Sequence, residues 1–403
     1  MDITRTGDSG ALRVTTLAQG WPDDRPGGLN RYVADLHAGL GRAGVDEELV
    51  VFGPAASAPG RVRRAVPEDS GMAARLLSTA REGVASGRGS AVVVSHFAMY
   101  GLLPSLVLRL TRRTPLVAHF HGPWAGESAS SGAGRASAAA KQLVERVHVR
   151  SAAAVVTASR AFGQLVQDVH GVPASRVHPI HPGVDLDRFH PLPEPERAAL
   201  RRRLGVPDGG RLVVTARRLV PRMGIDVLLQ AWPGGPDDRL VVVGDGPSRA
   251  ALEAEAARLG RPGVVFAGRV DEEALVAHYQ AADAVVVPST ALEGFGLVVL
   301  EALACGTPVV ASDLGGLSEV LPGLDPTLMV PPDDVPALRA RLQAALAGDL
   351  PDRAACRATA QEHSREAFAA AVAAVYRQVA AEAAERGARR ASRRPAPGAE
   401  RAR

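Results

Sequence analysis

The sequence has no long hydrophobic run and few cysteines. No stretch approaches 18 consecutive apolar residues, which is about the length that a helix needs to cross a bilayer. Two cysteines among 403 residues are too few for a disulfide framework or a four-cysteine zinc site. The first thirty residues contain no basic segment followed by an apolar run, so no signal peptide is expected. These absences predict a cytoplasmic protein.

The sequence also has little net charge outside its C-terminal tail. The formal net charge is +4, but the segment from Arg386 to Arg403 has seven arginines and one glutamate, so it carries +6 and the residues before it carry −2. A nearly neutral body argues against a nucleic-acid partner. The tail at residues 387–403 is rich in Arg, Ala, Pro and Gly and is expected to be disordered.

Weak peripheral contact with the inner face of a membrane is a second expectation for this chain. The basic tail could touch anionic lipid. Arg109, Arg112 and Arg113 follow an apolar helical pattern and could face lipid headgroups, although a solvated helix end is the simpler interpretation.

Short valine-rich runs alternate with helical patterns along the chain, as in repeated βα units around a parallel sheet. The runs are Leu12–Leu17, Glu48–Phe52, Ala91–Val94, Leu116–Phe120, Ala153–Thr157, Arg211–Ala216, Leu240–Val243, Val264–Ala267, Ala284–Val287 and Pro308–Ala311. The helical patterns are Leu29–Ala43, Ala73–Val84, Tyr100–Thr111, Ala138–Arg150, Ile225–Ala231, Arg249–Leu259, Glu272–Ala281 and Leu297–Cys305.

The chain is longer than one hydrophobic core normally organises, and the four prolines of Pro182–Pro195 interrupt the alternation. The predicted fold is therefore α/β, with two doubly wound, Rossmann-like domains facing across a cleft. We expect an N-terminal domain at residues 1–186, with a flexible start at 1–10, and a C-terminal domain at 187–363. A helix at 364–386 should pack back toward the N-terminal domain.

Glycine-rich turns between strands and helices are the places where such domains bind ligands. The first is Pro26-Gly27-Gly28-Leu29, which taken alone is better explained by a tight turn that binds nothing. The second, Val243-Gly244-Asp245-Gly246-Pro247, resembles the start of a dinucleotide fingerprint. Arg249 occupies the third small position of that pattern and disfavours a nicotinamide cofactor, so we interpret this turn as structural.

The third glycine-rich turn carries two carboxylates. An apolar strand runs into the loop that holds Glu293, which precedes Gly294 and Gly296, and Glu301 lies within the apolar helix that follows. A carboxylate in an apolar helix face costs free energy unless it is paired or accepts hydrogen bonds. Two vicinal hydroxyls, such as those of a ribose, would satisfy it with charge-assisted bonds of about 1.5–3 kcal/mol each. The alternative is an N-cap and a surface carboxylate without a ligand.

The string from Glu293 to Pro308, E-G-F-G-L…E-A…G-x-P, resembles the signature of glycosyltransferase family 4, whose members are retaining GT-B glycosyltransferases. The resemblance extends from Gly27-Gly28 to the final helix. Four further strings support it: His119-Phe120-His121-Gly122, Pro182-Gly183-Val184-Asp185, Arg217-Arg218-Leu219-Val220 and Gly268-Arg269-Val270.

This resemblance implies a role for each matching residue. Glu301 would hold the ribose of a nucleotide and Glu293 the hydroxyls of the donor sugar. Arg218 would neutralise the diphosphate, Gly28 would approach it from the other domain, and His121 would bond the sugar near the reacting centre. The remaining donor contacts would come from Gly294, Phe295, Gly296 and Leu297, with Arg269 and Val270 beside the nucleobase.

One position departs from the family pattern. The family usually has a lysine five residues after the arginine, where this chain has Met223. Arg222 is adjacent and is expected to supply the second positive charge, although arginine does not simply replace lysine. If neither position contributes, Arg218 alone must carry the diphosphate, or the enzyme is impaired.

The expected reaction is transfer of a hexose-type sugar from a nucleoside diphosphate, uridine or guanosine, to an acceptor hydroxyl. The acceptor would be a sugar, a glycolipid or a small alcohol. The resemblance implies retention of configuration and no metal or other cofactor; the only D-x-D string, Asp185-Leu-Asp187, lies in the hinge, and we interpret it as structural. A GT-B sugar-nucleotide epimerase and a catalytically impaired nucleotide-sugar-binding protein remain open as alternatives.

Overall fold

The computed structural model describes residues 10–22, 27–52, 59, 62–64, 71–124, 135–261, 263–291 and 293–392. The chain forms two compact units, which are described separately. Unit 1 comprises Met1–Thr157, Gly163–Ile180 and Ala369–Arg403, and unit 2 comprises Ala158–Phe162 and His181–Phe368. The division therefore falls after Ile180, where the sequence predicted it after residue 186. The predicted flexible start lies, except for Gly10, outside the described residues.

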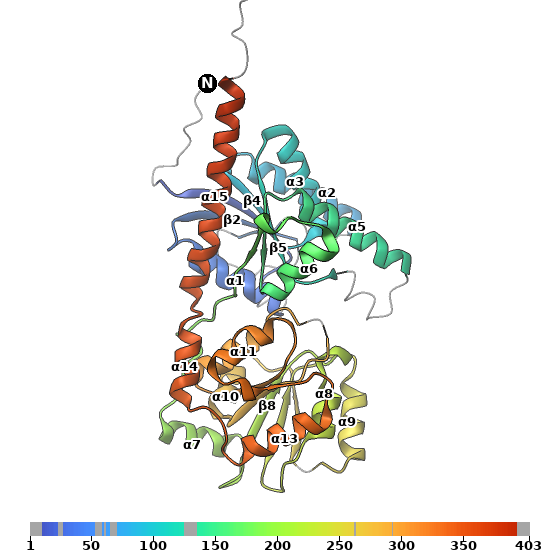
Figure 1. Cartoon of the computed structure of the whole chain (residues 1–403), viewed down its shortest axis with the longest axis vertical. Helices are drawn as coiled ribbons and strands as arrows, with labels where there is room; N and C mark the ends of the chain where they lie inside the picture. The colour runs from blue at the N-terminus through green and yellow to red at the C-terminus, as the bar shows by residue number, and fades with distance from the viewer. Residues whose placement is uncertain are drawn as a thin grey trace, which may run out of the picture. The chain divides into compact units, whose positions relative to one another are not determined.

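Unit 1 contains a seven-stranded sheet in the order β3-β2-β1-β4-β5-β6-β7, and every strand pair in it is parallel (Figure 1). Its strands are β1 Leu12–Ala18, β2 Val45–Val51, β3 Val62–Arg64, β4 Val92–Ser95, β5 Leu116–Phe120, β6 Ala154–Thr157 and β7 Val177–Pro179. The central strands are buried, because helices cover both faces of a parallel sheet, and this accounts for their valine-rich composition.

The helices of unit 1 follow its strands. They are α1 Gly28–Leu40, α2 Met72–Gly87, α3 Ala98–Arg112, α5 Arg135–Ser151, α6 Arg160–His170, whose first residues belong to unit 2, and the larger part of α15 Arg365–Ser392. Helices α2 and α3 pack against each other, and α3 also packs against α5 (Figure 1). From the centre of the sheet the chain runs out to β3 and returns to β4, so the strand order switches between β1 and β4.

Unit 2 contains a six-stranded parallel sheet in the order β10-β9-β8-β11-β12-β13. Its strands are β8 Leu212–Ala216, β9 Arg239–Val243, β10 Val264–Gly268, β11 Ala284–Val287, β12 Val309–Ser312 and β13 Met329–Val330. The helices are α7 Glu194–Arg203, α8 Ile225–Ala231, α9 Arg249–Arg258, α10 Glu272–Ala281, α11 Leu297–Ala304, α12 Leu321–Leu324, α13 Val335–Leu346 and α14 Arg353–Gln361. Here the strand order switches between β8 and β11.

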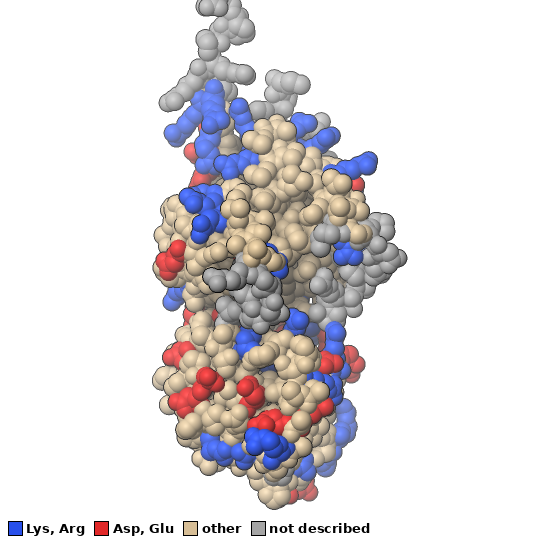
Figure 2. Space-filling view, turned by 90° about the vertical axis from the view of Figure 1, so that its right-hand side faces the viewer, with Lys and Arg blue, Asp and Glu red and all other residues tan. Residues whose placement is uncertain are grey.

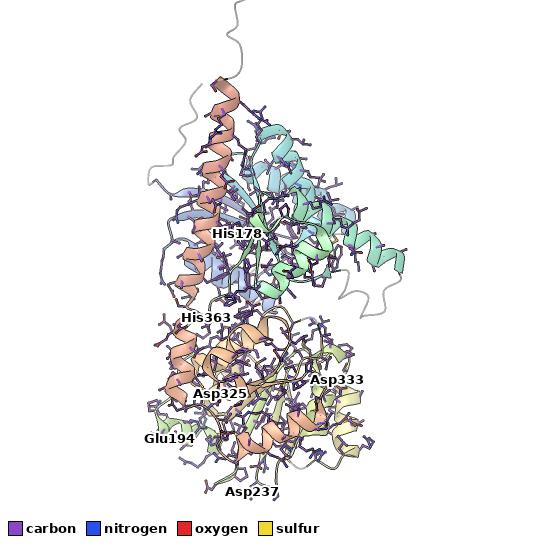
Figure 3. The ribbon with its side chains drawn as sticks, viewed as in Figure 1. His178, Glu194, Asp237, Asp325, Asp333 and His363 are labelled. Atoms are coloured by element: carbon purple, nitrogen blue, oxygen red, sulfur yellow. The ribbon has the colours of Figure 1, made fainter. Side chains whose placement is uncertain are left out.

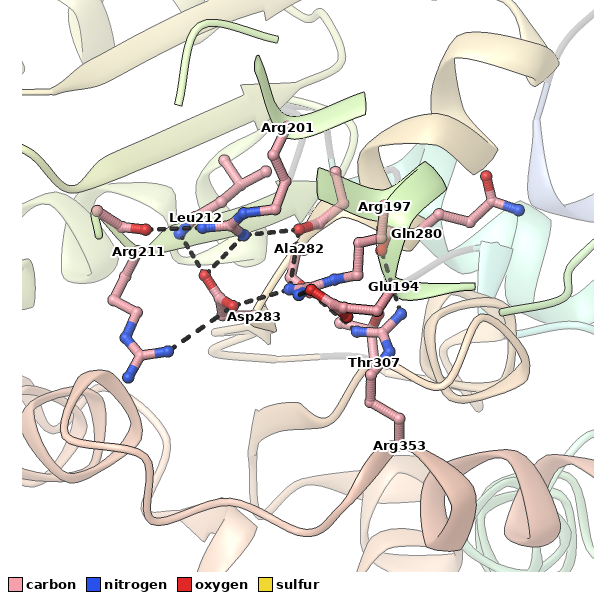
Figure 4. A network of polar contacts seen from close by, with 12 residues as sticks. Glu194, Arg197, Arg201, Arg211, Leu212, Gln280, Ala282, Asp283, Thr307 and Arg353 are labelled. Atoms are coloured by element: carbon pink, nitrogen blue, oxygen red, sulfur yellow. Dashed lines mark hydrogen bonds and ion pairs between the residues drawn. The ribbon is translucent and has the colours of Figure 1, made fainter. Parts of the chain in front are cut away.

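Helix α7 is attached to the sheet of unit 2 through one aspartate. The Asp283 carboxylate accepts hydrogen bonds from Arg197 at 2.8 Å and from Arg201 at 2.9 Å, both on α7 (Figure 4). It also accepts the backbone N–H of Leu212 at 2.8 Å, at the start of β8. This helix was not predicted from the sequence, because it begins inside the proline-rich segment Pro182–Pro195. Its first turn tolerates proline, since the first N–H groups of a helix have no partner within the helix.

The C-terminal helix α15 ends later than the sequence predicts. It continues through Gly387 to Ser392, so the predicted end at residue 386 is wrong by six residues and the first part of the expected disordered tail is helical. A single glycine costs only about 1 kcal/mol within a helix, and the alanines and arginines around it favour helix. Residues 393–403, the rest of that tail, lie outside the described residues.

Candidate functional site

Two loops of unit 2 lie where its strand order switches. The first, Arg217–Gly224, follows β8, and the second, Pro288–Gly296, follows β11. Because β8 and β11 are paired and parallel, both loops leave the same edge of the sheet, where open α/β sheets bind ligands. The backbone N–H of Thr290 donates to the carbonyl of Arg222 at 2.9 Å. Gly224 has a φ of +66°, and a Cβ there would lie 1.9 Å from the carbonyl oxygen of Pro288, so only glycine allows this approach.

Glu293 is buried at this edge and forms an ion pair with Arg217, whose side chain is only 6% exposed. The Ser289 hydroxyl donates to the same carboxylate at 2.8 Å. Burial alone would raise the pKa of Glu293, but the Arg217 guanidinium, the hydrogen bonds from Arg217 and Ser289, and the nearby charge of Arg222 together hold this pKa below its ordinary value. Glu293 is therefore an anion at neutral pH.

Arg217 is a site residue that the sequence analysis missed. The resemblance pointed instead to Arg218, which lies one position further along and is exposed. The two arginines differ in environment, because Arg217 pairs with the buried Glu293 whereas Arg218 is exposed. A pair of arginines after a strand is a signal for a functional cation, but it does not tell which of the two points inward.

Met223, the position that departs from the family pattern, also contacts Arg217. Its sulfur lies 2.8 Å from Nη2 of Arg217 and its side chain is buried. Arg222 lies in the short 3-10 turn Pro221–Met223 and contributes favourably to the charge balance of Glu293. Arg217 and Arg222 thus supply positive charge near Glu293, although position 223 is not a lysine.

The glycines after Glu293 bring the backbone close to a neighbouring turn. Gly296 has a φ of +77° and caps the N-terminus of α11, which begins at Leu297. A Cβ on Gly316 would lie 2.2 Å from the carbonyl oxygen of Gly294. Phe295 is buried. The turn therefore presents the first N–H groups of α11 at the same sheet edge as Glu293, an arrangement that favours an anion.

Glu301 lies on α11, and the residue is only 6% exposed. The hydroxyl of Tyr279, a fully buried residue of α10, donates to Oε2 of Glu301 at 3.2 Å. From the sequence, ligand hydroxyls were the expected partners of this carboxylate. The structure adds a tyrosine that holds one of its two oxygens and thereby orients the carboxyl group.

Arg269 and Val270 follow β10, the edge strand beyond β9. Arg269 is exposed and Val270 half-buried. The intervening turn after β9 packs tightly on the first loop, because a Cβ on Gly244 would lie 1.9 Å from the carbonyl oxygen of Arg217. This contact supports the structural interpretation of Gly244 and Gly246.

In unit 1, the predicted residues lie near the switch between β1 and β4. Gly28 begins α1, and a Cβ there would meet no described atom within 4 Å. His121 directly follows β5, and its Nε2 lies 3.0 Å from Nδ1 of His96, which follows β4. Burial lowers the pKa of His121 to about 3, so its imidazole is neutral and can bond a polar ligand without carrying charge.

His119 is held by two tyrosines. Its Nδ1 lies 3.0 Å from the Tyr32 hydroxyl and its Nε2 lies 2.8 Å from the Tyr376 hydroxyl. Burial, together with the neighbouring histidine, lowers the pKa values of His96 and His119 well below the ordinary range. In the described part of the chain, these two residues and His121 are the one group with metal-ligand spacing, each with a nitrogen within 4.8 Å of the others. Both nitrogens of His119 already have partners.

The carboxylates of unit 2 do not form such a group among the described residues. Those labelled in Figure 3, namely Glu194, Asp237, Asp325 and Asp333, come from four different turns or helix starts. The hinge carboxylate Asp185 accepts the backbone N–H groups of Asp187 and Arg188, both at 3.1 Å, and pairs with Arg365 at 2.7 Å. These bonds support the structural interpretation of the Asp185-Leu-Asp187 string.

Two doubly wound units, each with polar and glycine residues at its switch point, are the architecture of the GT-B fold. Two family models match the sequence: "Glycosyltransferase Family 4" over residues 26–188 and "Glycosyl transferases group 1" over residues 196–363. The sucrose-phosphate synthase of Thermosynechococcus elongatus has the same fold, with a TM-score of 0.74 and 25% identity over 92% of this chain and 100% of that chain.

Curated relatives agree with these matches. A D-inositol 3-phosphate glycosyltransferase 1 from Catenulispora acidiphila is 33% identical over 88% of this chain and 90% of its own length. One from Xylanimonas cellulosilytica is 42% identical over 43% of each chain. A GDP-mannose-dependent α-(1-6)-phosphatidylinositol monomannoside mannosyltransferase from Mycolicibacterium smegmatis is 40% identical over 47% of this chain. The alignments with the last two span only about half of those relatives, 43% and 52%.

The chain belongs to glycosyltransferase family 4 and is a GT-B glycosyltransferase. This membership confirms the fold class and the family that the motifs around Glu293 and Glu301 predicted. As for membranes, every helix in the described ranges is either too short or too polar to span a bilayer.

Proposed function

We propose that this enzyme transfers a hexose from a nucleoside diphosphate sugar to an acceptor hydroxyl, with retention of configuration and without a metal ion. The observation that carries the proposal is the arrangement at one sheet edge of unit 2. There, a charged carboxylate, Glu293, pairs with Arg217 and feels the positive charge of Arg222 just before the glycine-rich start of α11, and a second carboxylate, Glu301, lies within α11.

In this proposal, unit 2 binds the donor. Glu301, oriented by the Tyr279 hydroxyl, accepts bonds from the ribose hydroxyls, and Glu293 accepts bonds from the donor sugar. Arg218, which is exposed, pairs with the diphosphate, assisted by Arg222 and by the N–H groups of Gly294–Leu297. Arg217 positions Glu293 and keeps it ionised.

The chemistry requires that the bond between the anomeric carbon and the phosphate oxygen breaks. The electron pair leaves with the diphosphate, the acceptor oxygen forms the new bond on the same face of the sugar, and the acceptor proton passes to the leaving phosphate. Fixed positive charge and backbone N–H donors stabilise the developing negative charge. Arg218, Arg222 and the α11 N-terminus supply this stabilisation, so no metal is needed in the proposal.

Unit 1 contributes His121 and Gly28 in this proposal. The neutral His121 imidazole bonds a hydroxyl of the donor sugar, and the open turn at Gly28 admits a phosphate oxygen to the N-terminus of α1. The two relatives named as D-inositol 3-phosphate glycosyltransferases suggest the acceptor: a phosphorylated cyclic polyol.

The test has two stages. First, thermal unfolding is recorded with UDP, GDP, ADP and TDP, since a bound nucleotide stabilises the folded protein by about 2.7 kcal/mol at 100 times its Kd. The matching nucleotide sugars are then incubated with D-inositol 3-phosphate, with free inositol, and without acceptor, with and without EDTA. NMR of the product gives the anomeric configuration.

Each outcome decides between the alternatives. Transfer with retention that survives EDTA supports the proposal. Interconversion of the donor sugar would identify an epimerase, and binding without turnover would identify an impaired binding protein. Among variants, Glu301→Gln and Arg218→Met should weaken donor binding, whereas Arg202→Met, an exposed arginine on α7, should not.

A further inference from the structure

Most of the exposed large apolar side chains in the described part of the chain lie on three helices of unit 1. Helices α2, α3 and α5 pack side by side (Figure 1). Of the seven such residues, five are on these helices: Leu77 at 69% exposed, Leu103 at 49%, Leu110 at 82%, Leu143 at 62% and Val147 at 41%. Single exposed leucines are ordinary, but a set gathered on adjacent elements marks an interaction surface.

The spacing of these residues forms continuous stripes. On α3, Leu103 and Leu110 are two turns apart, and the half-buried Leu106 and Val107 lie between them, so positions i, i+3, i+4 and i+7 of the outer face are apolar. On α5, Leu143 and Val147 are one turn apart. We call the exposed surface of α2, α3 and α5 the outer helical face.

Basic residues dominate the charge on this face. The three helices contain eight arginines or lysines and two glutamates, and α3 has no acidic residue. Arg109, Arg112 and Arg113 are exposed at the end of α3, and Arg146 and Arg150 are exposed on α5 beside Val147. Figure 2 shows a largely uncharged surface on unit 1, with scattered Lys and Arg and few Asp or Glu.

The one acidic residue of α5 does not contribute to the surface. Glu145 is buried, and its carboxylate accepts the backbone N–H of Trp124 at 2.7 Å. The exposed charge around the leucines of α3 and α5 is therefore positive among the described residues.

We propose that the outer helical face docks on the surface of an anionic membrane. Leucines and valines on a helix face enter the boundary between headgroups and acyl chains, while arginines bind lipid phosphates. A second copy of the chain would bring the same positive charge against itself, which disfavours a symmetric dimer through this face. This inference concerns a surface apart from the proposed donor site and does not depend on it.

Flotation of the full chain with lipid vesicles tests the proposal. The protein should float with vesicles of phosphatidylcholine and phosphatidylglycerol, and much less with phosphatidylcholine alone, and added salt should release it. Each arginine neutralised, as in Arg112→Gln or Arg150→Gln, should weaken partitioning about fivefold. Leu110→Glu should weaken it further. A chain truncated after Ser392 should still bind, which separates this face from the basic tail.

Matched controls lie in unit 2. Helix α7 also ends in exposed arginines, so Arg202→Gln should leave partitioning unchanged, as should Val265→Glu at the 47% exposed Val265. Failure of the protein to float with anionic vesicles at low salt would overturn the proposal. A loss of partitioning in the control variants equal to that in the variants of the outer helical face would overturn it too. Binding that Leu110→Glu leaves unchanged would show a purely electrostatic contact and would also overturn it. Binding to an acidic protein but not to vesicles would assign the face to a protein partner.

A labelled variant supplies a measurement that does not depend on loss of binding. Both native cysteines are buried and fully shielded, so Leu110→Cys can carry a polarity-sensitive dye selectively. Its emission should shift to the blue when anionic vesicles are added, and the same dye at Val265→Cys should not shift. An unshifted dye at position 110 on vesicle-bound protein would contradict insertion of this face.

Discussion

The hydroxyl of Tyr376 lies 2.8 Å from Nε2 of His119, although the two residues are 257 positions apart. Both are buried, and the Tyr32 hydroxyl lies 3.0 Å from the other nitrogen of the same ring. The C-terminal helix α15 therefore forms part of the same polar cluster as β5, the strand that leads to His121.

Replacing Tyr376 by phenylalanine should destabilise unit 1 without changing its packing. The ring remains, but one nitrogen of His119 loses its partner in a buried site, which costs about 1–3 kcal/mol. Urea denaturation measures this loss. The control is Gln378→Ala on the exposed side of the same helix, which should change the free energy of unfolding by less than about 0.5 kcal/mol. Equal stabilities for Tyr376→Phe and the wild type would show that the bond contributes nothing.

Arg217 and Arg218 should differ in what their loss affects. Arg217→Met removes the partner of the buried Glu293 carboxylate and should cost about 3–5 kcal/mol of stability at neutral pH. Arg218→Met removes an exposed charge, so it should leave stability nearly unchanged and, under the proposed function, weaken donor binding. Chemical denaturation and nucleotide titration of both variants check this division. Unaltered stability in Arg217→Met would contradict the role assigned to the ion pair.

The pH dependence of stability should reverse in Arg217→Met. In the wild type the pKa of Glu293 is lowered, so its contribution to stability is present above the unfolded pKa and is lost as the pH falls through the folded pKa. Without Arg217, burial raises this pKa, and the variant should gain stability relative to the wild type as the pH falls and Glu293 becomes neutral. The double variant Arg217→Met/Glu293→Gln should recover stability at neutral pH. If this account is wrong, denaturation across pH 5 to 8 will show a constant difference in the free energy of unfolding between Arg217→Met and the wild type.

The buried histidines should make unit 1 sensitive to acid. Burial lowers the pKa of His121 from 6.5 to about 3, so the unfolded chain binds a proton that the folded chain does not. The contribution of His121 to the free energy of unfolding is fully present above about pH 6.5. Below that pH it falls by about 1.4 kcal/mol for each unit that the pH drops toward the folded pKa. His121→Asn should flatten this slope, and mutation of the exposed His190 should not. The slopes come from denaturation at each pH.

The three-histidine cluster should not retain a metal. Both nitrogens of His119 have tyrosine partners, and His96 and His121 share one contact, so a metal would have to displace several of these bonds. Metal analysis of protein dialysed against EDTA, then against zinc, should find no stoichiometric metal. Stoichiometric zinc that is lost in His96→Ala would contradict this expectation and the proposed metal independence together.

The sequence by itself determined the fold class and the location of the glycine-rich loops that the proposed function uses. Valine-rich runs identified the long central strands, because parallel strands covered on both faces must be apolar throughout. It missed β3, β7 and β13, of three residues or fewer, which are too short to form a pattern. The sequence also located Glu293 and Glu301, because they flank a glycine-rich helix start. Such a pattern is local and can be recognised from the order of the residues alone.

Only the tertiary structure decided which side chains meet. The choice of Arg217 over Arg218, the Tyr279 hydroxyl on Glu301, and the two tyrosines on His119 each join residues from different elements. Such contacts depend on the direction of a side chain and on how helices pack on a sheet. Local propensity specifies neither the direction of a side chain nor the packing of the helices. The same sequence pattern is compatible with a side chain that points inward or outward until the surrounding core is assembled.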